Sequence, residues 1–176
     1  IPTIAFFHFS FRQYHNGNRR KLERLGHKME VYDKIVTICN AMKAEGCEMY
    51  PYLKDKFVTI YNAFDTEVIR QKAEEQVGSS LIEKPYILAV QRLEESQKDL
   101  TTLLKAYQIL VKQEAIDESL YVIGEGKSQP MLQQLCEQLE ISQRVFFLGK
   151  KLNPYPWMKH CHTFVLSSKF EGLPSV

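Results

Sequence analysis

The sequence predicts an α/β protein with a parallel, doubly wound, Rossmann-like sheet. Short apolar and β-branched runs alternate with stretches of helical composition, and the connections between them are short. The helical stretch 99–113 places its apolar residues on one stripe at a spacing of three and four, as a helix packed on a sheet does. The run 34–39 is apolar on both faces, which is typical of a parallel strand covered on both sides. Such alternation favours a parallel sheet with crossover helices.

The first part of the chain contains alternating strands and helices with recognisable ends. Asn40 and Asp65 are suitable N-cap residues, and Gly26 is a suitable helix stop. The expected strands are 4–7, 34–39 and 56–61, and the expected helices are 18–25, 40–46 and 65–76, the last ended by residues 78–80.

The second part alternates more regularly. Pro130 falls in the first turn of a predicted helix, where its missing N–H has no cost. The expected strands are 86–90, 120–123, 145–148 and 163–166, and the expected helices are 99–113, 129–139 and 154–159.

Composition excludes several classes of protein. With 176 residues, 44% of them hydrophobic, the chain can bury a core. A net charge of +2, spread along the sequence, does not predict a nucleic-acid partner, which usually requires a strongly basic face. No apolar run approaches the length of a membrane span.

The cysteines and histidines predict neither disulfides nor a metal site. The four cysteines show no CxxC spacing, so we expect reduced thiols in a cytoplasmic protein. The triplet His160-Cys161-His162 lacks a second ligand pair at a suitable spacing, and no metal is expected.

Cations and glycines follow the strands of the second part where each strand ends. Arg92 and Lys98 come after the first of these strands, and Lys150 after the third. Gly124 and Gly126 follow the second, where they would let a ligand approach the backbone. Because ligands of doubly wound sheets bind outside the carboxyl ends of the strands, we expect these residues to converge. Arg and Lys together would offset most of the charge of a diphosphate without a metal.

The end of the sequence carries a carboxylate at a strand-to-helix corner. The strand 163–166 is followed by two serines, then by Glu171, Gly172 and an apparent first helical turn. Such a corner directs free backbone N–H groups at whatever lies above the sheet. A carboxylate suits neutral hydroxyls better than phosphate, because two anions repel each other. The corner therefore predicts a sugar or ribose site.

Taken together, these motifs resemble the family 4 glycosyltransferases, which are retaining, metal-independent enzymes of the GT-B fold. The strand ending in Gln91-Arg92-Leu93, with Lys98 after it, resembles the family's strand, Arg-Leu and Lys pattern. Residues 121–126 are similar to its Gly-x-Gly segment, and residues 167–174 to the start of its paired-glutamate element.

The resemblance also implies a domain organisation. Residues 61–65 are similar to the hinge segment that ends the family's N-terminal domain. We therefore expect residues 1–78 to be the tail of an N-terminal, acceptor-side domain with its hinge. Residues 79–176 would form a GT-B type, C-terminal nucleotide-sugar-binding domain, truncated at its C-terminus. The sequence starts without Met and ends before the second glutamate of the paired-glutamate element. We therefore expect a fragment that binds donor poorly and catalyses little.

Roles for individual residues follow from the same resemblance. Arg92 and Lys98 would hold the donor diphosphate and stabilise its charge as it leaves, and Glu171 would bind the transferred sugar. These three would be the catalytic residues. His8 would lie on the acceptor side, although a structural histidine explains it equally well. The remaining expected donor-binding residues are Gly124, Gly126, Lys150 beside the nucleotide base, Gly172, Leu173 and Pro174.

The expected partners are a UDP- or GDP-sugar donor and a glycan or lipid-linked acceptor, as in polysaccharide biosynthesis, with no cofactor. The resemblance is compatible with a cytoplasmic enzyme that associates peripherally with the inner membrane. The sequence itself shows no exposed amphipathic basic helix that would favour membrane contact.

Two alternatives stay open. Gln91 and Ala63 stand where the family usually has glycine, which favours a non-catalytic or degenerate nucleotide-binding module. A Rossmann-type epimerase or dehydrogenase would need a third glycine in the Gly124 turn, but residue 129 is glutamine.

Overall fold

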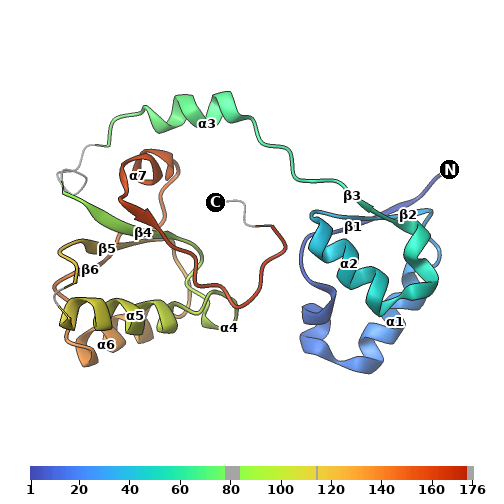
Figure 1. The fold of residues 1–176 in the computed structure, drawn as a ribbon, viewed down its shortest axis with the longest axis horizontal. Helices are drawn as coiled ribbons and strands as arrows, with labels where there is room; N and C mark the ends of the chain where they lie inside the picture. The colour runs from blue at the N-terminus through green and yellow to red at the C-terminus, as the bar shows by residue number, and fades with distance from the viewer. Residues whose placement is uncertain (78–83, 114, 174–176) are drawn as a thin grey trace. The chain divides into compact units, whose positions relative to one another are not determined.

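Two separate parallel sheets form the structure, a computed structural model that describes residues 1–77, 84–113 and 115–173, without the side chains of 14–16 (Figure 1). One unit contains Ile1–Phe64 with the described part of 170–175, and the other contains Asp65–Lys169. The predicted α/β class with parallel strands is confirmed. The predicted domain division after residue 78 stays a prediction. The helix end expected at 78–80 and the site residue Pro174 lie outside the described residues.

In the first unit, three parallel strands follow one another in the order β1-β2-β3. All three were predicted, although the last two are shorter than expected, and two 3-10 helices were not predicted. The elements are β1 (Ile4–Phe7), η1 (Phe11–Gly17), α1 (Arg19–Met29), β2 (Lys34–Thr37), α2 (Asn40–Met49), η2 (Pro51–Lys56) and β3 (Phe57–Thr59).

Two glycines in this unit lie inside helices, so the predicted helix ends at Gly26 and Gly46 are wrong. A Cβ at Gly26 would lie 2.8 Å from the ring of Tyr50, and a Cβ at Gly46 would lie 2.7 Å from the ring of Phe57. Both glycines are buried. Their role is to let aromatic rings pack directly on the helix backbone, and the helices continue past them.

The second unit has four parallel strands in the order β6-β5-β4-β7. Its predicted elements are all present, and the four-residue helix α4 was not predicted. The elements are α3 (Thr66–Ala73), β4 (Tyr86–Val90), α4 (Glu95–Lys98), α5 (Leu100–Lys112), β5 (Ser119–Ile123), α6 (Gln129–Gln138), β6 (Val145–Phe147), α7 (Tyr155–His160) and β7 (Thr163–Phe164).

The chain reverses direction across this sheet at β4. Strands β4, β5 and β6 progress to one side, and β7 returns to pair with the other side of β4. As a result α5 and α6 cover one face and α7 covers the other, as Figure 1 shows. This reversal between β4 and β7 is the topological switch point, where doubly wound sheets bind ligands.

Each face of the second sheet has its own core. Ala89 and Val122 pack with the stripe of α5 predicted from the sequence, which includes Leu103 and Leu104. On the other face Tyr86, Tyr121 and Trp157 pack together, and the Tyr86 hydroxyl donates to the carbonyl of Trp157 (2.7 Å). Burial raises the pKa of Tyr86.

A single carboxylate fixes η1 to α2 in the first unit. Glu45 accepts hydrogen bonds from the Ser10 hydroxyl (2.7 Å), the Phe11 amide (2.8 Å) and the Arg12 amide (3.3 Å). The amide of Phe11 is thereby satisfied where its ring is fully buried in the core.

We expect Glu45→Ala to lower the free energy of unfolding by about 2–3 kcal/mol, because it leaves part-buried donors unpaired. Glu48→Ala is the control, since Glu48 makes only an exposed ion pair with Arg12 (2.7 Å) and should cost under about 1 kcal/mol. Urea unfolding measures both. Equal effects would show that Glu45 acts through its charge alone.

Candidate functional site

The segments that follow the strands of the second sheet are hydrogen-bonded to one another. The amide of Gln91, after β4, donates to the carbonyl of Ile123 (3.0 Å), and the amide of Leu93 donates to that of Glu125 (3.0 Å). The amide of Gly124, after β5, donates to the carbonyl of Gly149 after β6 (3.0 Å). We call this edge of the sheet, with residues 91–98, 124–128, 149–150 and 167–169, the rim.

The two glycines after β5 are required by the protein's own backbone. A Cβ at Gly124 would lie 1.9 Å from the carbonyl oxygen of Gln91, and Gly124 has φ +142°. A Cβ at Gly126 would lie 2.4 Å from the carbonyl oxygen of Leu93. The space predicted to admit a ligand is therefore occupied by residues 91–93. The donor-binding role of both glycines stays a prediction.

Arg92 and Lys98 are both on the rim, at the start of the β4–α4 loop and at the end of α4. The Arg92 guanidinium donates to Gln97 Oε1 (3.1 Å) and lies 3.8 Å from a carboxylate oxygen of Glu94. Its side chain is 69% exposed, so it is accessible to an anion. Lys98 is half-buried, and its carbonyl accepts a hydrogen bond from the Ser167 hydroxyl (2.8 Å).

Glu94 and Lys127 are rim residues that the sequence analysis did not select. The Lys127 ammonium lies 3.3 Å from Glu94 Oε1, and this hydrogen bond holds the pKa of Glu94 below its usual range. The carboxylate therefore stays ionised near neutral pH. Their place in the sequence could have identified them, because Glu94 lies two residues after Arg92 and Lys127 lies directly after Gly126.

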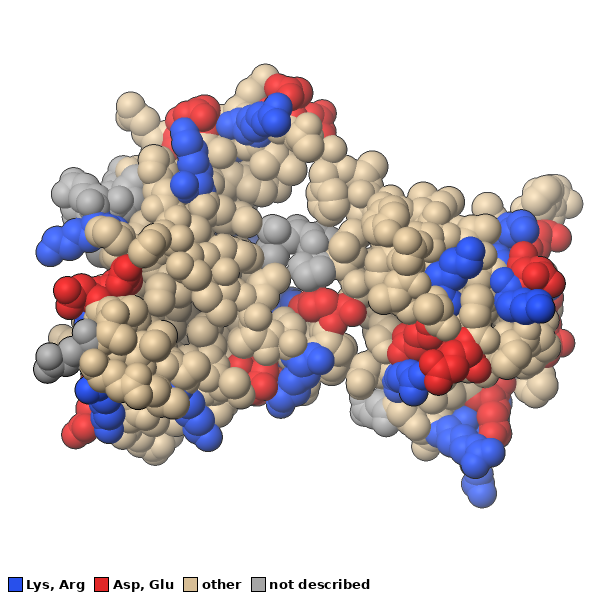
Figure 2. All heavy atoms as spheres, in the orientation of Figure 1, with Lys and Arg blue, Asp and Glu red and all other residues tan. Residues whose placement is uncertain are grey.

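Lys150 is also on the rim, where it pairs with Glu125 at 3.9 Å, and both side chains are exposed. The rim carries five cations against the three carboxylates Glu94, Glu95 and Glu125. Figure 2 shows that acidic and basic side chains are otherwise intermixed on the visible face of each unit. The rim can attract a compact anion, and the visible faces carry no continuous basic surface.

The segment after β7 lies along α4. Besides the bond from Ser167, the amide of Lys169 donates to the carbonyl of Gln97 (2.8 Å), and the Lys169 ammonium lies 3.7 Å from Asp99 Oδ1. Asp99 has the left-handed conformation (φ 49°) that separates α4 from α5. The switch-point strands β4 and β7 are therefore held together beyond their paired residues.

The remaining site residues that were predicted from the sequence and are described in the structure belong to the first unit. The carbonyl of Gly172 accepts from the Cys39 thiol (3.3 Å), and a Cβ at Gly172 would lie 2.2 Å from the carbonyl of His8. Leu173 packs against the core of that unit, and the His8 ring stacks on Phe6 (centroids 4.9 Å apart). Glu171 is half-buried. The roles predicted for His8, Glu171, Gly172 and Leu173 stay predictions.

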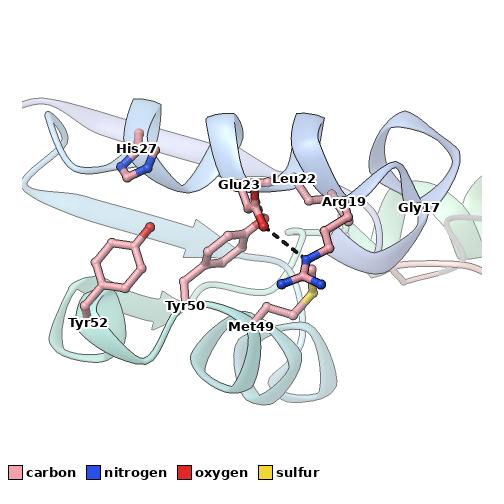
Figure 3. A pocket seen from close by; sticks show the side chains of 8 residues that line it. All are labelled: Gly17, Arg19, Leu22, Glu23, His27, Met49, Tyr50 and Tyr52. Atoms are coloured by element: carbon pink, nitrogen blue, oxygen red, sulfur yellow. Dashed lines mark hydrogen bonds and ion pairs between the residues drawn. The ribbon is translucent and has the colours of Figure 1, made fainter.

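A separate cavity of about 460 Å³ lies in the first unit, between α1 and the segment 49–52 (Figure 3). The Tyr50 ring lines it beneath the ion pair of Arg19 with Glu23 (3.1 Å), and the Tyr52 hydroxyl points toward His27. None of the site residues predicted from the sequence lines this cavity.

The described residues contain neither a metal centre nor a membrane-spanning helix. In residues 1–77, 84–113 and 115–173, no group of three or more His, Cys, Asp or Glu side chains is placed to hold a metal ion. No helix within those ranges has the length and apolar character needed to cross a bilayer.

Sequence comparison relates the chain to known enzymes. The profile of the family described as "Glycosyl transferases group 1" matches residues 46–176. The chain is 36% identical over 117 residues to the N-acetylgalactosamine-N,N'-diacetylbacillosaminyl-diphospho-undecaprenol 4-alpha-N-acetylgalactosaminyltransferase of Campylobacter jejuni, covering 66% of this chain and 30% of that protein. It is 30% identical over 178 residues to an uncharacterized glycosyltransferase of Haemophilus influenzae, covering 100% of this chain and 46% of that protein. The chain thus spans less than half the length of these relatives.

Solved structures of glycosyltransferases have a similar fold. A variant of S. aureus TarM, in complex with fondaparinux, alpha-GlcNAc-glycerol and UDP, superposes with a TM-score of 0.75 at 15% identity, over 98% of this chain and 33% of that one. Anabaena HepE in complex with UDP superposes with a TM-score of 0.74 at 16% identity, over 95% of this chain and 47% of that one.

The close approach at the rim predicts a large effect of Gly124→Ala. The new Cβ would clash with the carbonyl of Gln91 and strain a backbone that L-residues rarely adopt, so we expect a loss of about 3 kcal/mol or more in urea unfolding. Gly149→Ala is the matched control, because Gly149 has φ +67° but no atom within 4 Å of its Cβ position. It should cost only the strain, about 1–2 kcal/mol. A milder effect at Gly124 than at Gly149 would contradict the close approach.

Proposed function

The chain belongs to group 1 of the glycosyl transferases and has the GT-B fold, and from this premise we propose that it carries the donor site of a sugar transferase. The full-length protein would transfer a sugar from a nucleotide-sugar donor to an acceptor, with retention of configuration and without a metal. Because the chain spans less than half of its relatives, this activity is proposed for the full-length protein. We propose little turnover by the chain alone.

One observation carries the proposal, namely that cations gather on the rim at the topological switch point. Arg92 is the second residue after β4, and Lys98 ends the helix that lies along the segment after β7. Lys127 and Lys150 also lie on the rim. Diphosphate is common to UDP-, GDP- and ADP-sugar donors, and a site with several cations suits it without a divalent metal.

The proposed mechanism uses these charges at the leaving group. As the bond between the sugar and the diphosphate breaks, negative charge develops on the phosphate oxygens, and Arg92 and Lys98 stabilise it. Glu171 orients the sugar through its hydroxyls, with Gly172, Leu173 and Pro174 alongside it. Lys150 lies beside the nucleotide base, and His8 contacts the acceptor.

UDP is the nucleotide that we propose. It is the ligand named in the solved complexes of TarM and HepE. The Campylobacter relative is named for adding N-acetylgalactosamine to a saccharide on diphospho-undecaprenol, so a glycan on a lipid carrier is the proposed acceptor. That carrier would place the enzyme on the cytoplasmic side of the inner membrane, in polysaccharide biosynthesis.

The basic outer face of helix α1 supports this location. Its apolar face packs into the core of the first unit with Met29, while Arg20, Lys21, Arg24 and Lys28 are exposed on one helical face. None of these four cations has an ion-pair partner among the side chains that the structure describes. They can therefore attract anionic headgroups.

A non-catalytic nucleotide-binding module is the second candidate. Gln91 favours it, because this buried residue stands where the family usually has glycine. Transfer or hydrolysis of a UDP-sugar by the full-length protein would exclude it.

The first test is calorimetric titration of the full-length protein with UDP, GDP and ADP, at low salt and with EDTA. We expect saturable binding of UDP, and a loss of affinity of about tenfold to a hundredfold in Arg92→Ala, because a charge-assisted contact to phosphate is removed. Arg70→Ala is the control, since Arg70 is an exposed arginine that pairs with Glu67 on α3. Unchanged affinity in Arg92→Ala would contradict the site.

The membrane proposal has its own test, co-sedimentation with lipid vesicles. The protein should bind vesicles rich in phosphatidylglycerol and not vesicles of phosphatidylcholine alone. Arg24→Glu should weaken this binding about tenfold or more, since each basic residue contributes on the order of 1 kcal/mol at an anionic surface. Lys105→Glu, an equal change at an exposed site on α5, should not weaken it. Equal loss in both variants would mean that only net charge matters.

A further inference from the structure

Gln91 has a fixed position at the switch point. It follows β4 directly, and its amide is bonded to β5 through the carbonyl of Ile123 (3.0 Å). Its own carbonyl oxygen occupies the space that a Cβ at Gly124 would need. The residue is only 5% exposed. Its backbone is therefore held against the end of β5 and the turn after it, and its side chain is buried.

The amide of this side chain has no partner within the protein. Neither Oε1 nor Nε2 of Gln91 makes a hydrogen bond among the described residues, and both atoms are buried. A buried polar group without a partner destabilises the fold, and an apolar side chain of similar shape would avoid this cost. Folding alone therefore gives no reason for glutamine here.

Ser168 shows the same feature independently. Its hydroxyl is buried and also lacks a partner among the described residues. It follows β7, which pairs with β4 through Leu88 and Phe164. Two unpartnered polar side chains thus follow the two strands that border the switch point, where the fold class binds its ligands.

The chemistry of the two groups favours a neutral, hydroxylated ligand. An amide presents a donor and an acceptor side by side, and a phosphate oxygen can satisfy only the donor. A hydroxyl group donates and accepts, so hydroxyls can satisfy both amide atoms. The nucleotide base is less suitable, because Lys150, its proposed neighbour, follows β6, two strands away from β4.

We propose that Gln91 and Ser168 bind hydroxyl groups of the transferred sugar and thereby select the donor sugar. This inference rests on the proposed function, because it requires a nucleotide-sugar on the rim. It adds two residues that distinguish one sugar from another, beside the cations that hold the diphosphate.

The test compares UDP with UDP-glucose and UDP-N-acetylgalactosamine in calorimetric titrations of the full-length protein. In Gln91→Met, which keeps the approximate shape and removes both polar atoms, we expect the tighter of the two UDP-sugars to bind at least about tenfold more weakly. The affinity for UDP should change less than about twofold. Ser168→Ala should show the same pattern more weakly. Gln134→Met, at an exposed glutamine of α6, is the control and should change neither affinity.

A second readout needs no ligand. The unliganded Gln91→Met protein should have an equal or higher Tm, by up to about 4 °C, because an unpaired amide is removed from the interior. A lower Tm with unchanged sugar affinity would show a structural role and overturn the inference. Equal weakening of UDP and UDP-sugars would assign Gln91 to the nucleotide and also overturn it. Absence of UDP binding by the parent protein would instead overturn the proposed function.

Discussion

The rim depends on one close approach, between the backbone of Gln91–Leu93 and the turn that contains Gly124 and Gly126. The carbonyl oxygens of residues 91 and 93 lie where side-chain carbons would stand at the two glycines. Because these segments are also hydrogen-bonded, the residues that follow β4 and β5 cannot move independently. This packing constraint brings Glu94 and Lys127 together, and their ion pair (3.3 Å) adds to it.

The strands and α5 were predictable because their signal is local. A buried parallel strand is a short apolar run, and the face of α5 is visible in its own periodicity. The interior helix glycines Gly26 and Gly46 were misread because the rings that pack on them, from Tyr50 and Phe57, are distant in sequence. A glycine at a helix end and a glycine under an aromatic ring cannot be distinguished without the tertiary contact.

The composition of the site was partly predictable, and its internal geometry was not. Parallel strands place their following residues at one edge, so Arg92, Lys98 and Lys150 could be expected on the rim. The pairing of Glu94 with Lys127 was missed because it joins two loops, and α4 because four residues are too few for a periodic signal. A net charge of +2 likewise gave no sign of the basic face of α1, where helical spacing brings four exposed cations together.

Exposed charges and buried neutral groups serve different purposes in such a site. The Arg92 side chain is 69% exposed, so water and salt screen it, and it attracts any diphosphate with little regard to the attached sugar. A buried amide discriminates more strongly, because a sugar without the matching hydroxyl leaves the amide unpaired in a medium that cannot solvate it. Selection among donors that share a nucleotide is therefore better achieved by Gln91 and Ser168 than by the cations around them. The unpaired amide destabilises the free protein, because it is removed from water without gaining a hydrogen bond. A sugar without the matching hydroxyl leaves the amide in the same state, so the same desolvation cost disfavours that sugar.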